Sequence, residues 1–109
     1  MAEQERLATA RMADVQSAPA GTIHLAEVVL FEHRGFGGAE WRTNLSYSYV
    51  GDFWNDKVSS IVVVCGIWQF FEHRDFGGRV WQLGPGYYDW VEAVGIPNDL
   101  ISSFKAVSI

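Results

Sequence analysis

The chain has 109 residues, of which 49% are hydrophobic, and this composition is typical of one globular domain. Its formal net charge of -5 disfavours nucleic acid as a partner, because proteins that bind nucleic acid present basic surfaces. The single cysteine, Cys65, excludes an internal disulfide, and no apolar run is long enough to predict a membrane-spanning helix.

Residues 1–22 are predicted to form a flexible N-terminal tail. Leu7, Met12 and Val15 indicate a weakly amphipathic helix, which Pro19 and Gly21 terminate in the manner of a linker. The segment is interrupted by charged residues and has no continuous apolar core, so it does not resemble a secretory signal. This favours a cytoplasmic location over a secreted one, although the sequence does not specify the compartment.

From residue 23 the pattern is that of β-strands, and we predict one domain over residues 23–109. In the first half, strands are expected at 26–31, 40–44 and 60–65, and a looser segment at 46–52 is expected to hold a short third strand. In the second half, strands are expected at 67–71, 79–83, 87–91 and 103–109. Glycine-rich turns separate the first two strands of each half.

Two motifs occur twice, in the same order. Phe31–Gly38 returns as Phe71–Gly78, identical at seven of eight positions, and Asn55–Ser60 returns as Asn98–Ser103. This internal duplication, with four strands expected in each unit, predicts two Greek-key motifs at about 26–65 and 66–109. The predicted fold class is therefore all-β, an antiparallel β-sandwich of two four-stranded Greek-key motifs that fold together.

The two halves differ on one strand. Aligning the repeated hexapeptides pairs Val62 with Lys105, and side chains alternate between the two faces of a strand. If Lys105 points to water, Val62 and Val64 point outward and form an apolar patch that needs cover. The N-terminal tail or a second copy of the protein would supply it, the latter as a homodimer through the Val62/Val64 face.

The repeated hexapeptides consist mainly of residues with hard oxygen donors. Asp carboxylates, Ser hydroxyls and backbone carbonyls are the ligands that Ca²⁺ takes, six to eight at a time. A single Asn-Asp and Ser-Ser pair is also typical of an ordinary turn. The repetition at equivalent places beside a repeated glycine-rich loop favours metal binding, although the chain contains no EF-hand loop.

These motifs together resemble the βγ-crystallin family, specifically its calcium-binding, microbial-type single domains with two Greek-key motifs. The family's Greek-key signature matches at Phe31, Phe36 and Gly38, and it matches again at Phe71, Phe76 and Gly78. The family's calcium motif, Asn/Asp-Asn/Asp-x-x-Ser/Thr-Ser, matches at both 55–60 and 98–103. The resemblance covers about residues 25–109 and leaves the N-terminal tail unexplained.

The resemblance implies two Ca²⁺ ions held between the Greek keys, with both halves contributing to each site. The aspartates would supply carboxylate oxygens, the serines hydroxyls, and the other residues backbone carbonyls, while Asn55 and Asn98 would pin the loops. The implied ligands are Glu32, Asp56, Lys57, Ser59, Glu72, Asp99, Leu100 and Ser102.

The predicted function is therefore calcium binding that stabilises the fold, in a structural, sensor or buffer role, without enzymatic activity. No hydrolase or phosphate-binding motif is present, and His33 and His73 lack partners at zinc spacing. The alternative is a protein-binding module on the same fold, such as a protease inhibitor or a toxin-like domain. The absence of disulfides disfavours that alternative, because secreted domains of this size commonly carry them.

Overall fold

The computed structural model describes residues 26–108 of the chain. The predicted tail of residues 1–22, the first three residues of the predicted domain and Ile109 lie outside the described residues. No helix within 26–108 is long and apolar enough to cross a membrane.

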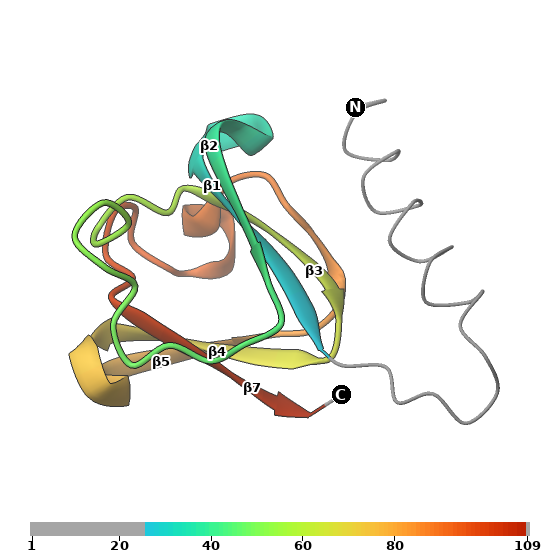
Figure 1. The fold of residues 1–109 in the computed structure, drawn as a ribbon. Helices are drawn as coiled ribbons and strands as arrows, with labels where there is room; N and C mark the ends of the chain where they lie inside the picture. The colour runs from blue at the N-terminus through green and yellow to red at the C-terminus, as the bar shows by residue number, and fades with distance from the viewer. Residues whose placement is uncertain (1–25, 109) are drawn as a thin grey trace, which may run out of the picture.

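Two antiparallel sheets pack face to face, as Figure 1 shows. The first has the order β2-β1-β3-β6, with β1 at Glu27–His33, β2 at Gly37–Thr43, β3 at Ser60–Cys65 and β6 at Gly86–Tyr88. The second has the order β5-β4-β7, with β4 at Ile67–His73, β5 at Gly77–Leu83 and β7 at Ser103–Ser108. The predicted all-β sandwich is confirmed.

The third segment of each half crosses to the sheet of the other half. β6 belongs to the second repeat by sequence, yet it pairs with β3 of the first through Ile61–Tyr88, Val62–Tyr87 and Val63–Gly86. In the first repeat the corresponding segment makes one isolated bridge, between Tyr47 and Phe104 of β7. Each half therefore completes the other, which is why neither would bury its apolar face alone.

Two strand predictions need correction. No strand forms at 46–52 beyond the Tyr47–Phe104 bridge. Beside this bridge the Ser46 side chain, rather than the backbone, accepts a hydrogen bond from the Ala106 N–H at 3.0 Å. The strand expected at 87–91 is instead β6 at Gly86–Tyr88, and a 3-10 helix, η3, covers Val91–Val94. That helix ends at Gly95, whose φ of 89° favours glycine.

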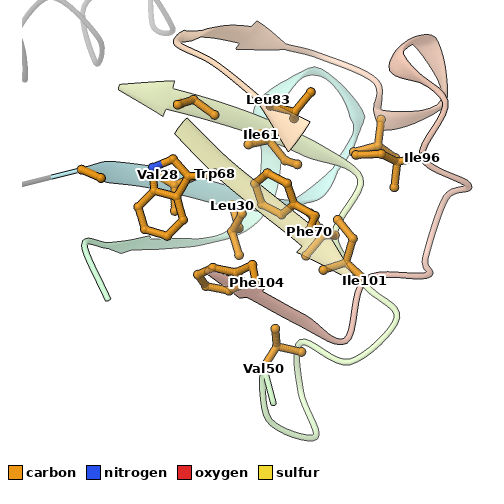
Figure 2. Close-up of a cluster of buried hydrophobic side chains, with 14 residues drawn as sticks. Val28, Leu30, Val50, Ile61, Trp68, Phe70, Leu83, Ile96, Ile101 and Phe104 are labelled. Carbon is orange, nitrogen blue, oxygen red and sulfur yellow. The ribbon is translucent and has the colours of Figure 1, made fainter. Parts of the chain in front are cut away.

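The main hydrophobic core fills the space between the sheets (Figure 2). Trp68, Phe70 and Phe104 are fully buried there, and Leu30 and Ile61 project into the same layer from the opposite sheet. The Trp68 indole N–H donates to the carbonyl oxygen of Cys65 at 3.1 Å, so its polar atom is satisfied inside the core. Alternate residues of β1 and β3 point into this core, as the period of two requires.

The hairpin between the first two strands of each half folds over at a short 3-10 helix, η1 (Arg34–Phe36) or η2 (Arg74–Phe76). A glycine follows each helix, and a Cβ at Gly38 would lie 2.6 Å from the His33 ring and 2.9 Å from the Glu32 Cβ. The same distances apply at Gly78. This close approach explains why the repeated motif ends in glycine.

Candidate metal centre

Each hexapeptide runs beside the first strand of its own half. The N–H of Ser59 donates to the carbonyl of Phe31, and the N–H of Ser102 donates to the carbonyl of Phe71, both at 3.0 Å. The next carbonyls along these strands belong to Glu32 and Glu72. Pairing of the backbone thus brings each hexapeptide serine next to the glutamate that follows the first aromatic residue.

The two hexapeptides are joined by a crossed pair of hydrogen bonds. The Ser59 hydroxyl donates to Oδ1 of Asn98 at 2.8 Å, and the Ser102 hydroxyl donates to Oδ1 of Asn55 at 2.7 Å. A hydroxyl that donates its only proton keeps its lone pairs for another partner. The asparagines therefore orient the two serine oxygens, in the pinning role expected for Asn55 and Asn98.

The last serine of each hexapeptide locks the folded hairpin. The Ser60 hydroxyl is fully buried; it donates to the His33 carbonyl at 2.6 Å and accepts from the Phe36 N–H at 3.0 Å. Ser103 repeats both bonds, with His73 at 2.6 Å and Phe76 at 3.1 Å. We did not predict this role from the sequence. The recurrence of the same serine at the end of both hexapeptides could have indicated it.

The second residue of each hexapeptide has a left-handed backbone, with φ of 59° at Asp56 and 60° at Asp99. Among residues with a side chain, Asp and Asn adopt this conformation most readily. Both carboxylates are exposed, since the left-handed turn directs the chain away from the core. The requirement for Asn or Asp at this position is therefore conformational as well as chemical.

An open pocket of about 530 Å³ lies where the two halves meet. Both aspartates and Ser59 line it, and so does Glu32. The remaining lining residues are His33, Arg34, Lys57, Trp90 and Asn98. The pocket thus collects oxygen donors from both hexapeptides, although the donors of one hexapeptide lie 39 or more residues from those of the other along the chain.

The side chains of Glu32 and Glu72 are used inside their hairpins. Oε1 of Glu32 accepts from the Ala39 N–H, and Oε1 of Glu72 accepts from the Arg79 N–H, each at 3.1 Å. Arg79 also donates to Glu72 through its guanidinium, and this bond holds the pKa of the Glu72 carboxyl below its usual range. Both carboxylate oxygens of Glu72 are thus bonded to Arg79, which leaves its backbone carbonyl as the oxygen available to a ligand.

Cationic side chains near the hexapeptides stack on aromatic rings. The Arg34 guanidinium lies 4.3 Å from the Trp90 ring centroid, and that of Arg74 lies 4.0 Å from the Tyr49 ring centroid. The Lys57 ammonium lies 5.7 Å from the Phe53 ring centroid. Each arginine comes from the folded hairpin of one half and its ring from the other, so these contacts add to the link between halves.

The donor set suits a hard cation. It contains one carboxylate from each hexapeptide, one oriented hydroxyl and backbone carbonyls, and these are calcium ligands. No group of three or more His, Cys, Asp or Glu side chains capable of holding a metal occurs within residues 26–108. A site that depends on hydroxyls and carbonyls contains few such side chains, so its donors fit Ca²⁺ better than Zn²⁺.

The predicted ligands fall into two groups. The structure brings Glu32, Asp56, Lys57, Ser59 and Asp99 together around the pocket. The other group consists of Glu72, Leu100 and Ser102, which occupy the equivalent positions in the second half. Ser102 there mirrors Ser59 in its hydrogen bonds to backbone and asparagine, so the duplication extends to the local geometry.

Comparison with known proteins gives a consistent result. Residues 27–107 match a family model described as Beta/Gamma crystallin. A solved betagamma-crystallin from an archaeon is 46% identical, with 77% of this chain and 100% of that chain covered and a TM-score of 0.74. One from Ciona intestinalis is 36% identical over 73% and 98% of the two chains, with a TM-score of 0.71.

A transition-metal-ion-binding betagamma-crystallin from Methanosaeta thermophila is 28% identical, over 73% of this chain and 99% of that chain, with a TM-score of 0.64. No curated protein sequence gave a significant match.

Proposed function

Since this chain belongs to the β/γ-crystallin family, we propose that it binds two calcium ions between its Greek-key motifs and that the ions stabilise the fold. The observation that carries the proposal is the crossed pair of hydrogen bonds, Ser59 to Asn98 and Ser102 to Asn55. These bonds fix one serine oxygen in each half, and Ser59 lines the pocket that Asp56 and Asp99 also line.

The first ion would be held by the Asp99 carboxylate, the Ser59 hydroxyl and the carbonyls of Glu32 and Lys57. The second would use the equivalent groups of Asp56, Ser102, Glu72 and Leu100. Because Lys57 and Leu100 contribute only backbone, their side chains are free to differ. Bound calcium would supply positive charge between loops that each carry an aspartate carboxylate and would thereby hold the two halves together; no catalytic step is involved.

Calorimetric titration with Ca²⁺, accompanied by thermal melts in calcium and in chelator, tests this proposal. With few formal charges per site, dissociation constants on the order of 10⁻⁶–10⁻⁴ M are expected. At a hundredfold excess over Kd, each bound ion adds about 2.7 kcal/mol to the free energy of unfolding. For a domain of this size that corresponds to a rise in Tm of roughly 10–20 °C.

A second metal class is distinguished by the same titration. His33 lines the pocket, with its Nε2 3.8 Å from Oε1 of Glu32, and one relative is described as binding transition-metal ions. If Ni²⁺ or Zn²⁺ bound at least as tightly as Ca²⁺ and His33→Ala abolished that binding, the calcium proposal would be wrong. Calcium heat that survives His33→Ala supports it.

A further inference from the structure

The outward face of the first sheet carries a second apolar cluster. Val29, Phe31, Val62 and Val64 form it, and Phe36 packs against its edge. The residues next to them along β1 and β3 point into the main core, namely Val28, Leu30, Ile61 and Val63. Because side chains alternate along a strand, the four residues of the second cluster point away from the main core. They are nevertheless at most 4% exposed.

The internal duplication supplies a matched comparison for this face. Val64 and Val107 occupy equivalent positions in the two halves, yet Val64 is 4% exposed and Val107 is 43% exposed.

The neighbouring positions differ in chemistry as well. Across the first sheet Val29 pairs with Val62, whereas at the equivalent place in the second sheet Gln69 pairs with Lys105. At this place the second sheet therefore presents polar side chains, whereas the first sheet presents buried apolar ones.

We propose that the N-terminal segment, residues 1–22, docks on this outer face of the first sheet. Within residues 26–108, Phe36 is the one partly buried hydrophobic residue packed against the cluster, and its ring centroid lies 5.4 Å from that of Phe31. The N-terminal segment is the part of the chain outside residues 26–108 that is long enough to cover the rest of the face.

The place where this segment joins the sandwich suits the proposal. Ala26, the residue before β1, is buried against Gly66, where an added Cβ would lie 2.5 Å from the Ala26 Cβ. Glu27 pairs with Cys65, the residue after Val64. The segment that precedes Ala26 therefore joins the sandwich at the edge of the apolar face. A helix of about 15 residues spans about 22 Å, which matches the roughly 23 Å length of a seven-residue strand.

The chemistry of the segment is also complementary to the face. Ala8, Met12 and Val15 recur at intervals of four and three, which places them on one side of a helix. At the rim of the face, Nε of Arg42 is buried without a hydrogen-bond partner among residues 26–108. Arg42 pairs with Val29, and the acidic residues of the segment offer acceptors for this N–H.

Limited proteolysis of the full chain tests docking from the side of the segment. Trypsin should cleave after Arg6 slowly in the wild type, because a docked segment is a poor substrate. Met12→Asp should speed this cleavage more than fivefold and raise the fluorescence of the dye ANS. Ala10→Asp adds the same charge about 200° away around a helix and should leave both unchanged.

The reciprocal variants test the face. Val62→Gln and Val64→Gln should each speed cleavage after Arg6, whereas Val107→Gln, the matched control for Val64 on the exposed position of the other half, should not. Sedimentation should show that the wild type is a monomer. Equal cleavage in Met12→Asp and Ala10→Asp would overturn the proposal. A wild-type dimer that Val62→Gln dissociates would instead show that a second copy covers the face.

Discussion

At the scale of single residues, the backbone at Asp56 separates conformation from chemistry. A residue at φ of 59° is strained unless it is Gly, Asn or Asp, by about 1–2 kcal/mol for Ala. The Asp56 carboxylate can therefore be removed by substitution with Gly, which adds no backbone strain, or with Ala, which does. This makes the aspartates the sharpest place to test the proposed sites.

We predict that Asp56→Gly keeps the Tm of the calcium-free protein within a few degrees but weakens calcium binding at least tenfold. Asp56→Ala should lose the same affinity and in addition lower the Tm in chelator, because Ala is strained where Gly is not. Calorimetry and thermal melts in chelator measure the two effects. Unchanged affinity in both variants would mean that the Asp56 carboxylate does not serve an ion.

The bond between Arg79 and Glu72 predicts a pH effect. Because the folded pKa of Glu72 lies below its unfolded value, its stabilising contribution is present above the unfolded pKa, about 4.3, and is lost as pH falls through the folded pKa. Arg79→Ala should raise the pKa of Glu72 in an NMR titration of the side-chain carboxyls. Arg42→Ala, which removes an arginine on the other sheet, should leave the Glu72 pKa unchanged.

At the scale of elements, the folded hairpin and the hexapeptide depend on each other. The Ser60 hydroxyl is hydrogen-bonded both to the carbonyl of the residue before η1 and to the N–H of the last residue of η1. The Ser103 hydroxyl makes the equivalent two hydrogen bonds at η2. The adjacent serines, Ser59 and Ser102, contact the opposite hexapeptide instead. Two neighbouring residues of one type thus have different roles, since one faces the hairpin and the other the region between the halves.

We predict that Ser60→Ala lowers the free energy of unfolding by about 1–3 kcal/mol, because it leaves a buried N–H and a carbonyl without a partner. The same variant should retain calcium affinity within about threefold. Ser59→Ala should show the opposite balance, with a smaller loss of stability in chelator and a clear loss of calcium affinity. Chemical denaturation and calorimetry compare the two, and equal behaviour of both variants would contradict this division of roles.

At the scale of the whole molecule, the exchange of third segments makes the two repeats one unit. β6 extends the first sheet, and Tyr47 bridges to the second, so separation of the halves would break pairing in both sheets. The proposed ions would act across the same boundary. Calcium should therefore raise the stability of the entire domain rather than of one half.

We expect a single cooperative unfolding transition in both calcium and chelator, shifted as a whole by the ion. Differential scanning calorimetry, together with tryptophan fluorescence from Trp41, Trp68 and Trp81, checks this, since these residues lie in different strands. Two separated transitions in chelator would show that the halves unfold independently and that the crossed hydrogen bonds do not couple them.

Most of the fold and the candidate ligands were predictable from the sequence, because their signals are local. The repeat, the alternation of β3 and the glycine at the folded hairpin all follow from steric and packing requirements at single positions, such as the close approach at Gly38. β3 itself was predicted with its observed bounds. Oxygen-rich hexapeptides likewise show their donor chemistry in their composition.

Only the tertiary structure decided what depends on distant residues. The pairing of β6 with β3, the crossed bonds from Ser59 to Asn98 and from Ser102 to Asn55, and the locking role of Ser60 join positions 23 to 47 residues apart. Only the tertiary structure likewise decided that Val64 is buried while Val107, at the equivalent position, is exposed. The sequence by itself determined that this is a duplicated Greek-key sandwich with oxygen-rich loops. How each half completes the other was decided by three-dimensional packing, because hydrogen-bond partners across a sandwich leave no periodic trace along the chain.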